Sequence, residues 1–138
     1  MNPGPVYDRR STSKDGLIDC EFYAKPKAKE LMTARSLAKN GHKVMFLRET
    51  DEGKNPDAAL DGDICDFKRI ESDNPNKIFQ NIKRSGKQAE LYVVDLRISR
   101  INAEDARRVS RQTVDSDETY AKKILILFAG EDECLIEK

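Results

Sequence analysis

The chain has 138 residues, which suffice for one domain with a hydrophobic core but not for two. Its formal net charge is zero, so it lacks the overall positive charge of a protein that binds nucleic acid over its whole surface, although a local basic stripe could still do so. No apolar run approaches the roughly 18 residues of a membrane-spanning helix, so we expect no membrane segment. Three cysteines are odd in number and match no zinc pattern, which indicates a reducing compartment.

Residues 1–16 are rich in Pro, Gly, Ser and charge, and we expect a flexible lead-in before a domain over residues 17–138. Apolar periodicity and turn residues predict, in chain order, a strand or arm at 17–24, a helix at 26–40, a strand at 44–49, a hairpin at 55–70, a helix from 74, a buried strand at 91–96, a helix at 102–113 and a hairpin of strands at 123–129 and 133–137. This order predicts a single α/β domain: an α-β-β-β-α-β core followed by a C-terminal helix and β-hairpin.

The hairpin at 55–70 carries the residues of greatest chemical interest. Asp61-Gly62 is typical of a two-residue turn with positive φ at both positions. With that turn, Asp57 faces Asp66 across the strand pair at roughly 5 Å between Cβ atoms, and Lys68 lies on the same face. Two such carboxylates could share a divalent ion, and Lys68 could stabilise charge on a phosphate. A solvated hairpin decorated with charges is the structural alternative.

Pro56-Asp57, a gap of eight residues, and Asp66-Phe67-Lys68 resemble the signature of the PD-(D/E)XK nucleases, whose core has the same element order. That resemblance implies a third acidic ligand on the first helix, and Glu30 is the matching position. It implies Mg²⁺ or another divalent metal held by Glu30, Asp57 and Asp66. Lys68 would position the attacking water or neutralise charge, and Gln88 would orient the substrate or Lys68.

A longer stretch, from LMTARSLAKNGHKVMFL through GKNPDAALDGDICDFK to IKRSGKQAELYVVDL, resembles nuclease toxin domains at the C-termini of bacterial contact-dependent growth inhibition proteins. The resemblance spans about Lys29 to Leu96. It implies a toxin that hydrolyses phosphodiester bonds in tRNA or DNA. It also implies a cytoplasmic site of action, delivery as part of a larger secreted or mobile-element protein, and a cognate immunity protein.

Lys77, Arg84 and Lys87 are expected on one side of the second helix, where a phosphate backbone could lie, although an ordinary solvated face fits equally. Two other functions remain open. One is a metal-independent, barnase-like ribonuclease toxin, which needs a general base although the chain has a single histidine, His42. The other is a non-catalytic module that binds nucleic acid or protein, with the carboxylates merely on its surface.

Overall fold

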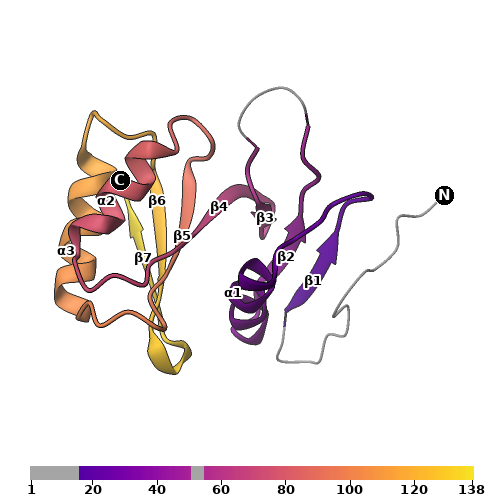
Figure 1. Cartoon of the computed structure of the whole chain (residues 1–138), viewed down its shortest axis with the longest axis horizontal. Helices are drawn as coiled ribbons and strands as arrows, with labels where there is room; N and C mark the ends of the chain where they lie inside the picture. The colour runs from indigo at the N-terminus through magenta and orange to yellow at the C-terminus, as the bar shows by residue number, and fades with distance from the viewer. Residues whose placement is uncertain (1–15, 51–54) are drawn as a thin grey trace. The chain divides into compact units, whose positions relative to one another are not determined.

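The computed structural model describes residues 16–50 and 55–138, so nearly all of the expected lead-in at 1–16 lies outside the described residues. These described residues form three α-helices, seven strands and one short 3-10 helix, η1 (Ala129–Glu131) (Figure 1). The chain divides into two compact units, Met1–Cys65 and Asp66–Lys138, and each is described by itself. The boundary between the units lies within strand β4 (Asp63–Arg69).

The first unit is built on a strand, a helix and a strand. Strand β1 (Leu17–Cys20) runs parallel to β2 (Lys43–Phe46), and helix α1 (Ala28–Lys39) connects them and packs against both (Figure 1). Ala34 and Leu37 of α1 are fully buried, as the apolar stripe of this helix predicts. Strand β1 is shorter than the predicted 17–24, because a turn follows it in which Tyr23 has a φ of 69°.

Strand β3 (Ala58–Leu60) completes this unit by pairing antiparallel with β2 on one side and with β4 on the other. The predicted turn is confirmed, since Asp61 and Gly62 have φ angles of 50° and 94°. The predicted register is confirmed from Leu60↔Asp63 to Ala58↔Cys65. Leu47 still donates its backbone N–H to Asp57 O at 3.1 Å, so pairing continues one residue beyond β2, although β2 itself ends before the predicted residue 49.

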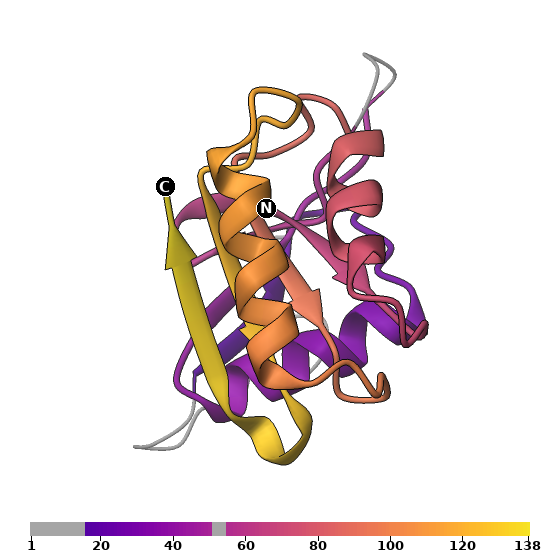
Figure 2. The same cartoon turned by 90° about the vertical axis from the view of Figure 1, so that its left-hand side faces the viewer.

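The second unit contains helices α2 (Asn76–Arg84) and α3 (Ala103–Asp115) and strands β5 (Leu91–Asp95), β6 (Lys123–Leu127) and β7 (Glu133–Glu137). Strand β5 is parallel to β6, and β6 is antiparallel to β7. Helix α3 lies across β6 and β7 and contacts α2 (Figure 2). Ile70, just after β4, donates its N–H to Asp95 O at 3.1 Å, which joins the end of β4 to β5.

Every residue of β5 is buried, as predicted for a central strand. The hydrophobic core of this unit lies between β5, β6 and the two helices, and includes Ile78, Ile82, Tyr92 and Ile124. Helix α3 begins next to Asn102, close to the predicted start at 102, and the Asn102 side chain caps it by accepting a hydrogen bond from the backbone N–H of Asp105. The mixed α/β class expected from the sequence is confirmed. Among the described residues, no helix is long and apolar enough to cross a membrane.

A candidate active site around Asp66 and Lys68

Asp66 and Lys68 of β4 form an ion pair in the second unit. They are two residues apart on one strand, so their side chains leave the same face. Lys68 Nζ lies 2.9 Å from Asp66 Oδ2, and Gln88 Nε2 donates to Asp66 Oδ1 at 3.0 Å. The Asp66 side chain is 2% exposed, whereas that of Lys68 is 22% exposed. The carboxylate is therefore held from both oxygens, while the lysine side chain retains contact with solvent.

Tyr92 of β5 lies near this pair and is completely buried. Burial raises the pKa of the Tyr92 phenol, and the negative charge of Asp66 raises it further, while the backbone of Ala89 and the hydroxyl of Ser85 offset part of the rise. Within the described part of the chain, the phenol oxygen has no hydrogen-bond partner of good geometry. Tyr92 therefore stays protonated beside Asp66 over the physiological pH range.

Glu30 and Asp57 belong to the first unit, where they line one small cavity of about 80 Å³ together with Glu49. Glu30 is half-buried, and its Oε1 accepts a hydrogen bond from Lys27 N at 2.8 Å, which caps α1. Carboxylate oxygens are the donors that Mg²⁺ takes. In the residues that the structure describes, however, no group of three or more His, Cys, Asp and Glu side chains is placed to hold a metal ion.

The predicted basic stripe is interrupted. Lys77 and Arg84 lie seven residues apart on α2 and therefore share a face. Lys87 lies beyond the end of the helix, because α2 stops at Arg84 and Gly86 has a φ of 61°. Its Nζ instead lies 5.2 Å from the ring centroid of Tyr120. The prediction that Lys87 lies on the second helix is wrong, because it took no account of Gly86 as a helix-terminating residue.

A second buried ion pair escaped the sequence analysis. Asp95, at the end of β5, is 1% exposed and accepts hydrogen bonds from Arg97 Nε at 2.9 Å and Nη2 at 2.6 Å. The signal for it was an aspartate closing an apolar run, with an arginine two residues later. Arg97 also donates its backbone N–H to Asp95 Oδ1 at 3.1 Å. Three hydrogen bonds between residues so close in the chain are typical of an interaction that stabilises the local backbone.

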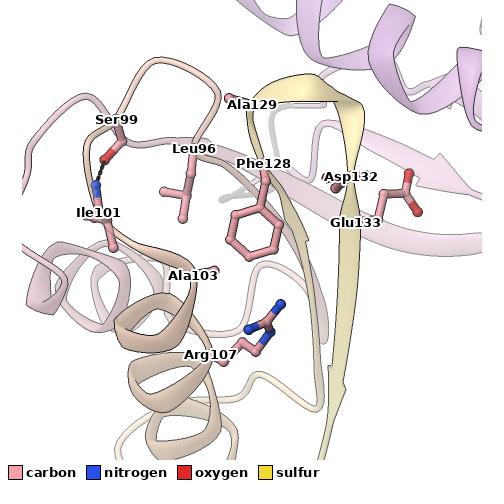
Figure 3. A pocket seen from close by; sticks show the side chains of 9 residues that line it. All are labelled: Leu96, Ser99, Ile101, Ala103, Arg107, Phe128, Ala129, Asp132 and Glu133. Atoms are coloured by element: carbon pink, nitrogen blue, oxygen red, sulfur yellow. Dashed lines mark hydrogen bonds between the residues drawn. The ribbon is translucent and has the colours of Figure 1, made fainter.

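A larger cavity of about 530 Å³ lies in the second unit, and Figure 3 shows the side chains that line it. Leu96 and Phe128, which directly follow the parallel strands β5 and β6, line it, and the Arg107 guanidinium lies 5.6 Å from the Phe128 ring centroid. Asp132 and Glu133 also line this cavity and oppose the charge of Arg107. None of the residues that the sequence analysis selected lines it.

The family described as the contact-dependent growth inhibition CdiA C-terminal domain matches residues 54–131, more than half of the 138 residues. The chain belongs to this family. It is therefore a growth-inhibition toxin domain, and the matched segment contains Asp57, Asp66, Lys68 and Gln88, whereas Glu30 precedes it. No curated protein matches the chain.

The fold of this CdiA C-terminal domain is similar to a solved structure described as a CdiA-CT/CdiI toxin and immunity complex from Burkholderia pseudomallei. The TM-score is 0.67 with 20% sequence identity, and the match covers 88% of this chain and 98% of the other. At that identity the likeness shows a shared fold.

Proposed function

We propose that this CdiA C-terminal domain is a nuclease toxin that hydrolyses phosphodiester bonds in tRNA or DNA. The observation that carries the proposal is the buried carboxylate of Asp66, held by Lys68 and Gln88 at 2.9 and 3.0 Å. A lysine fixed beside a carboxylate and still open to solvent suits a site where negative charge develops on a substrate.

In the proposed reaction a water oxygen attacks phosphorus and releases a proton to solvent. The bond from phosphorus to the leaving oxygen breaks, and the leaving oxygen takes up a proton from solvent. Negative charge then develops on the phosphate oxygens, and the Lys68 ammonium would stabilise that charge. Asp66 would act as a positioning residue, since it holds Lys68 in one rotamer, and Gln88 would keep the Asp66 carboxylate in place. Lys77 and Arg84 would contact backbone phosphates further along the nucleic acid.

A divalent ion such as Mg²⁺ remains part of the proposal, in the manner of the PD-(D/E)XK nucleases. Glu30 and Asp57, which lie together in the first unit, would supply oxygen donors for it, and such donors suit a hard cation. Such an ion would polarise the phosphate and lower the pKa of a bound water. The cavity that Glu30 and Asp57 share supports their assignment as ligands.

Metal-independent cleavage is the second candidate function. The arrangement of the potential metal-ligating side chains favours it. The part of the chain that the structure describes gathers no three metal-ligating side chains, and Lys68 already neutralises Asp66. In this scheme His42, whose Nδ1 lies 2.6 Å from Asp61 Oδ2, is a candidate general base.

Incubation of the purified protein with total tRNA and with plasmid DNA, in Mg²⁺, Mn²⁺, Zn²⁺ or EDTA, tests these proposals together. Cleavage that requires a divalent ion supports the metal-assisted scheme. Cleavage of RNA at full rate in EDTA, lost in His42→Gln, supports the metal-independent scheme. Intact RNA and DNA under every condition would overturn the nuclease proposal and leave a non-catalytic binding module as the alternative.

We also propose that a cognate immunity protein neutralises this domain, which acts in the cytoplasm of the target cell after delivery within a larger secreted protein. The similar solved structure is described as a toxin and immunity complex, which supports such a partner. Induced expression of the domain in bacteria should arrest growth, and Lys68→Ala should relieve the arrest. Equal growth arrest by both proteins would exclude Lys68 from the toxic activity.

A further inference from the structure

We propose that a cavity lined by Lys87 and Tyr120 binds one unpaired nucleotide of the nucleic acid, so that this toxin acts on single-stranded segments. The inference rests on the proposed nuclease function and names the form of its substrate. The cavity lies within the second unit and has a volume of about 500 Å³. That volume is within the range of roughly 300–1,000 Å³ that small-molecule sites occupy.

The cavity and the candidate active site share one segment of chain, since Lys87 and Ala89 line the cavity and Gln88 lies between them in the sequence. Lys87 lines the cavity, and the next residue, Gln88, donates to Asp66 Oδ1. Backbone hydrogen bonds fix the other walls: Lys122 N donates to Glu90 O at 2.8 Å, and Lys138 N donates to Lys122 O at 2.9 Å. A nucleotide in this cavity would therefore lie one residue along the chain from the side chain that holds Asp66.

Tyr120 gives the cavity an aromatic surface. Its large side chain is 50% exposed, and Lys87 Nζ lies over the ring at 5.2 Å from its centroid. Exposed aromatic rings serve as stacking platforms for bases, and each stacked base contributes about 1–3 kcal/mol. A lysine next to such a ring can contact the phosphate of the same nucleotide.

The charge of the cavity matches an anionic ligand. Lys87, Lys122 and Lys138 line it, against the single acidic residue Glu90. Lys122 Nζ and Glu90 Oε2 are 3.1 Å apart, but their side chains are 62% and 67% exposed. An exposed pair of this kind contributes little, so Lys122 can turn to a phosphate at small cost.

The exposed Tyr120 ring favours the binding of an unpaired base over a base within a duplex. In a duplex both faces of each base are covered by its neighbours, whereas a base in a loop or at an end can leave the stack and lie on an aromatic ring. The Tyr120 ring can therefore stack only on a base that is already unpaired or is pulled from the helix. We expect loops, bulges and single-stranded ends to be bound and cleaved in preference to duplex.

The test measures binding in the Lys68→Ala background, so that the probe is not cleaved during the measurement. Fluorescence anisotropy would follow labelled single-stranded RNA and DNA 12-mers and their duplexes. Tyr120→Ala should weaken single-strand binding about 10-fold, as loss of one stacked base implies. Tyr120→Phe should keep it, because the ring remains. Phe22→Ala is the matched control, since Phe22 is also 50% exposed and lies in the first unit.

A second readout separates failure of this inference from failure of the proposed function. The nucleotide site is overturned and the nuclease stands if the parent protein cleaves nucleic acid and Tyr120→Ala changes neither quantity. Those quantities are the cleavage rate of the parent and the single-strand affinity of the Lys68→Ala protein. The nucleotide site is also overturned if the Lys68→Ala protein binds duplexes as tightly as single strands. If the parent neither cleaves nor binds any of the probes, the nuclease proposal falls and this inference falls with it. Thermal unfolding of Tyr120→Ala must match the parent for the comparison to count.

Discussion

Lys68 Nζ lies 2.9 Å from Asp66 Oδ2, and Gln88 holds the other oxygen of the same carboxylate. All three side chains belong to the second unit, and all three lie in the segment that matches the CdiA C-terminal domain family. The predictions that follow separate what this cluster does for stability from what it does for the proposed cleavage of nucleic acid.

Lys68→Ala should lower the rate of nucleic-acid cleavage by a factor of about 10² or more, because charge stabilisation at the phosphate is lost. It should also destabilise the protein by about 1–3 kcal/mol, because Asp66 stays buried with one partner fewer. Arg97→Ala is the matched control, since it breaks the ion pair with the equally buried Asp95. Chemical unfolding and cleavage rates would be measured on both.

Similar destabilisation of the two variants, with cleavage lost only in Lys68→Ala, is the expected outcome. If Arg97→Ala loses as much activity as Lys68→Ala at a temperature where both are folded, the loss reflects the fold and not the ammonium group.

Gln88→Leu should lower stability by about 1.5–3 kcal/mol, because a hydrogen bond to a charged group is removed. Its cleavage rate should fall less than that of Lys68→Ala, because Gln88 acts on Asp66 and only through it on Lys68. Gln80→Leu, on the exposed face of α2, is the control and should change neither quantity. A Gln88→Leu protein as stable and active as the parent would contradict the role of this contact.

Tyr92→Phe should leave stability unchanged or raise it. The substitution keeps the buried ring and removes a phenol oxygen that has no well-formed hydrogen bond within the described residues. Leaving such a group buried costs about 1–3 kcal/mol. Thermal unfolding checks this expectation. A clear fall in the melting temperature would mean that the hydroxyl makes a bond to the protein or to a buried water.

Asp61 in the hairpin turn gives a pH-dependent contribution to stability. Burial acts to raise its pKa, but hydrogen bonds from His42 and from the Lys43 N–H outweigh burial, so the pKa of this carboxyl is lowered. Its stabilising effect is complete above the ordinary carboxyl pKa of about 3.9 and disappears as the pH falls through the lowered value.

Urea unfolding of the parent and of Asp61→Asn between pH 2 and 7 measures this effect. Asparagine also tolerates the positive φ at this position, so the substitution removes the charge without straining the turn. The parent should be the more stable protein at pH 5 to 7, and the difference should shrink towards pH 2. A difference that does not change with pH would mean that the His42–Asp61 contact does not depend on the charge of Asp61.

The elements of the fold could be predicted from the sequence because their signals are local. Asp61-Gly62 defines the hairpin turn, the run from Leu91 defines the buried strand, and Asn102 marks the start of α3. The predicted ends of β1 and α2 were less accurate. Each element ends close to one residue with a positive φ, Tyr23 after β1 and Gly86 after α2.

The candidate site could be predicted in part. Asp66 and Lys68 are two residues apart on one strand, so the strand period alone brings them together. Gln88 was named from a resemblance, and its bond to Asp66 spans 22 residues of chain, which no local pattern encodes. The cavity lined by Lys87 and Tyr120 is formed by segments that lie far apart in the chain, so no local sequence pattern predicts it.

The part that Lys68 plays in phosphodiester cleavage is tested by the rates at which the parent and Lys68→Ala cleave tRNA and plasmid DNA, measured at equal concentrations of folded protein in Mg²⁺. We predict that the parent cleaves at least one of these substrates and that Lys68→Ala does so about 10² times more slowly or not at all. Equal cleavage rates for the two proteins would exclude Lys68 from the reaction. No cleavage of either substrate by the parent, with any divalent ion or with EDTA, would overturn the proposed nuclease function.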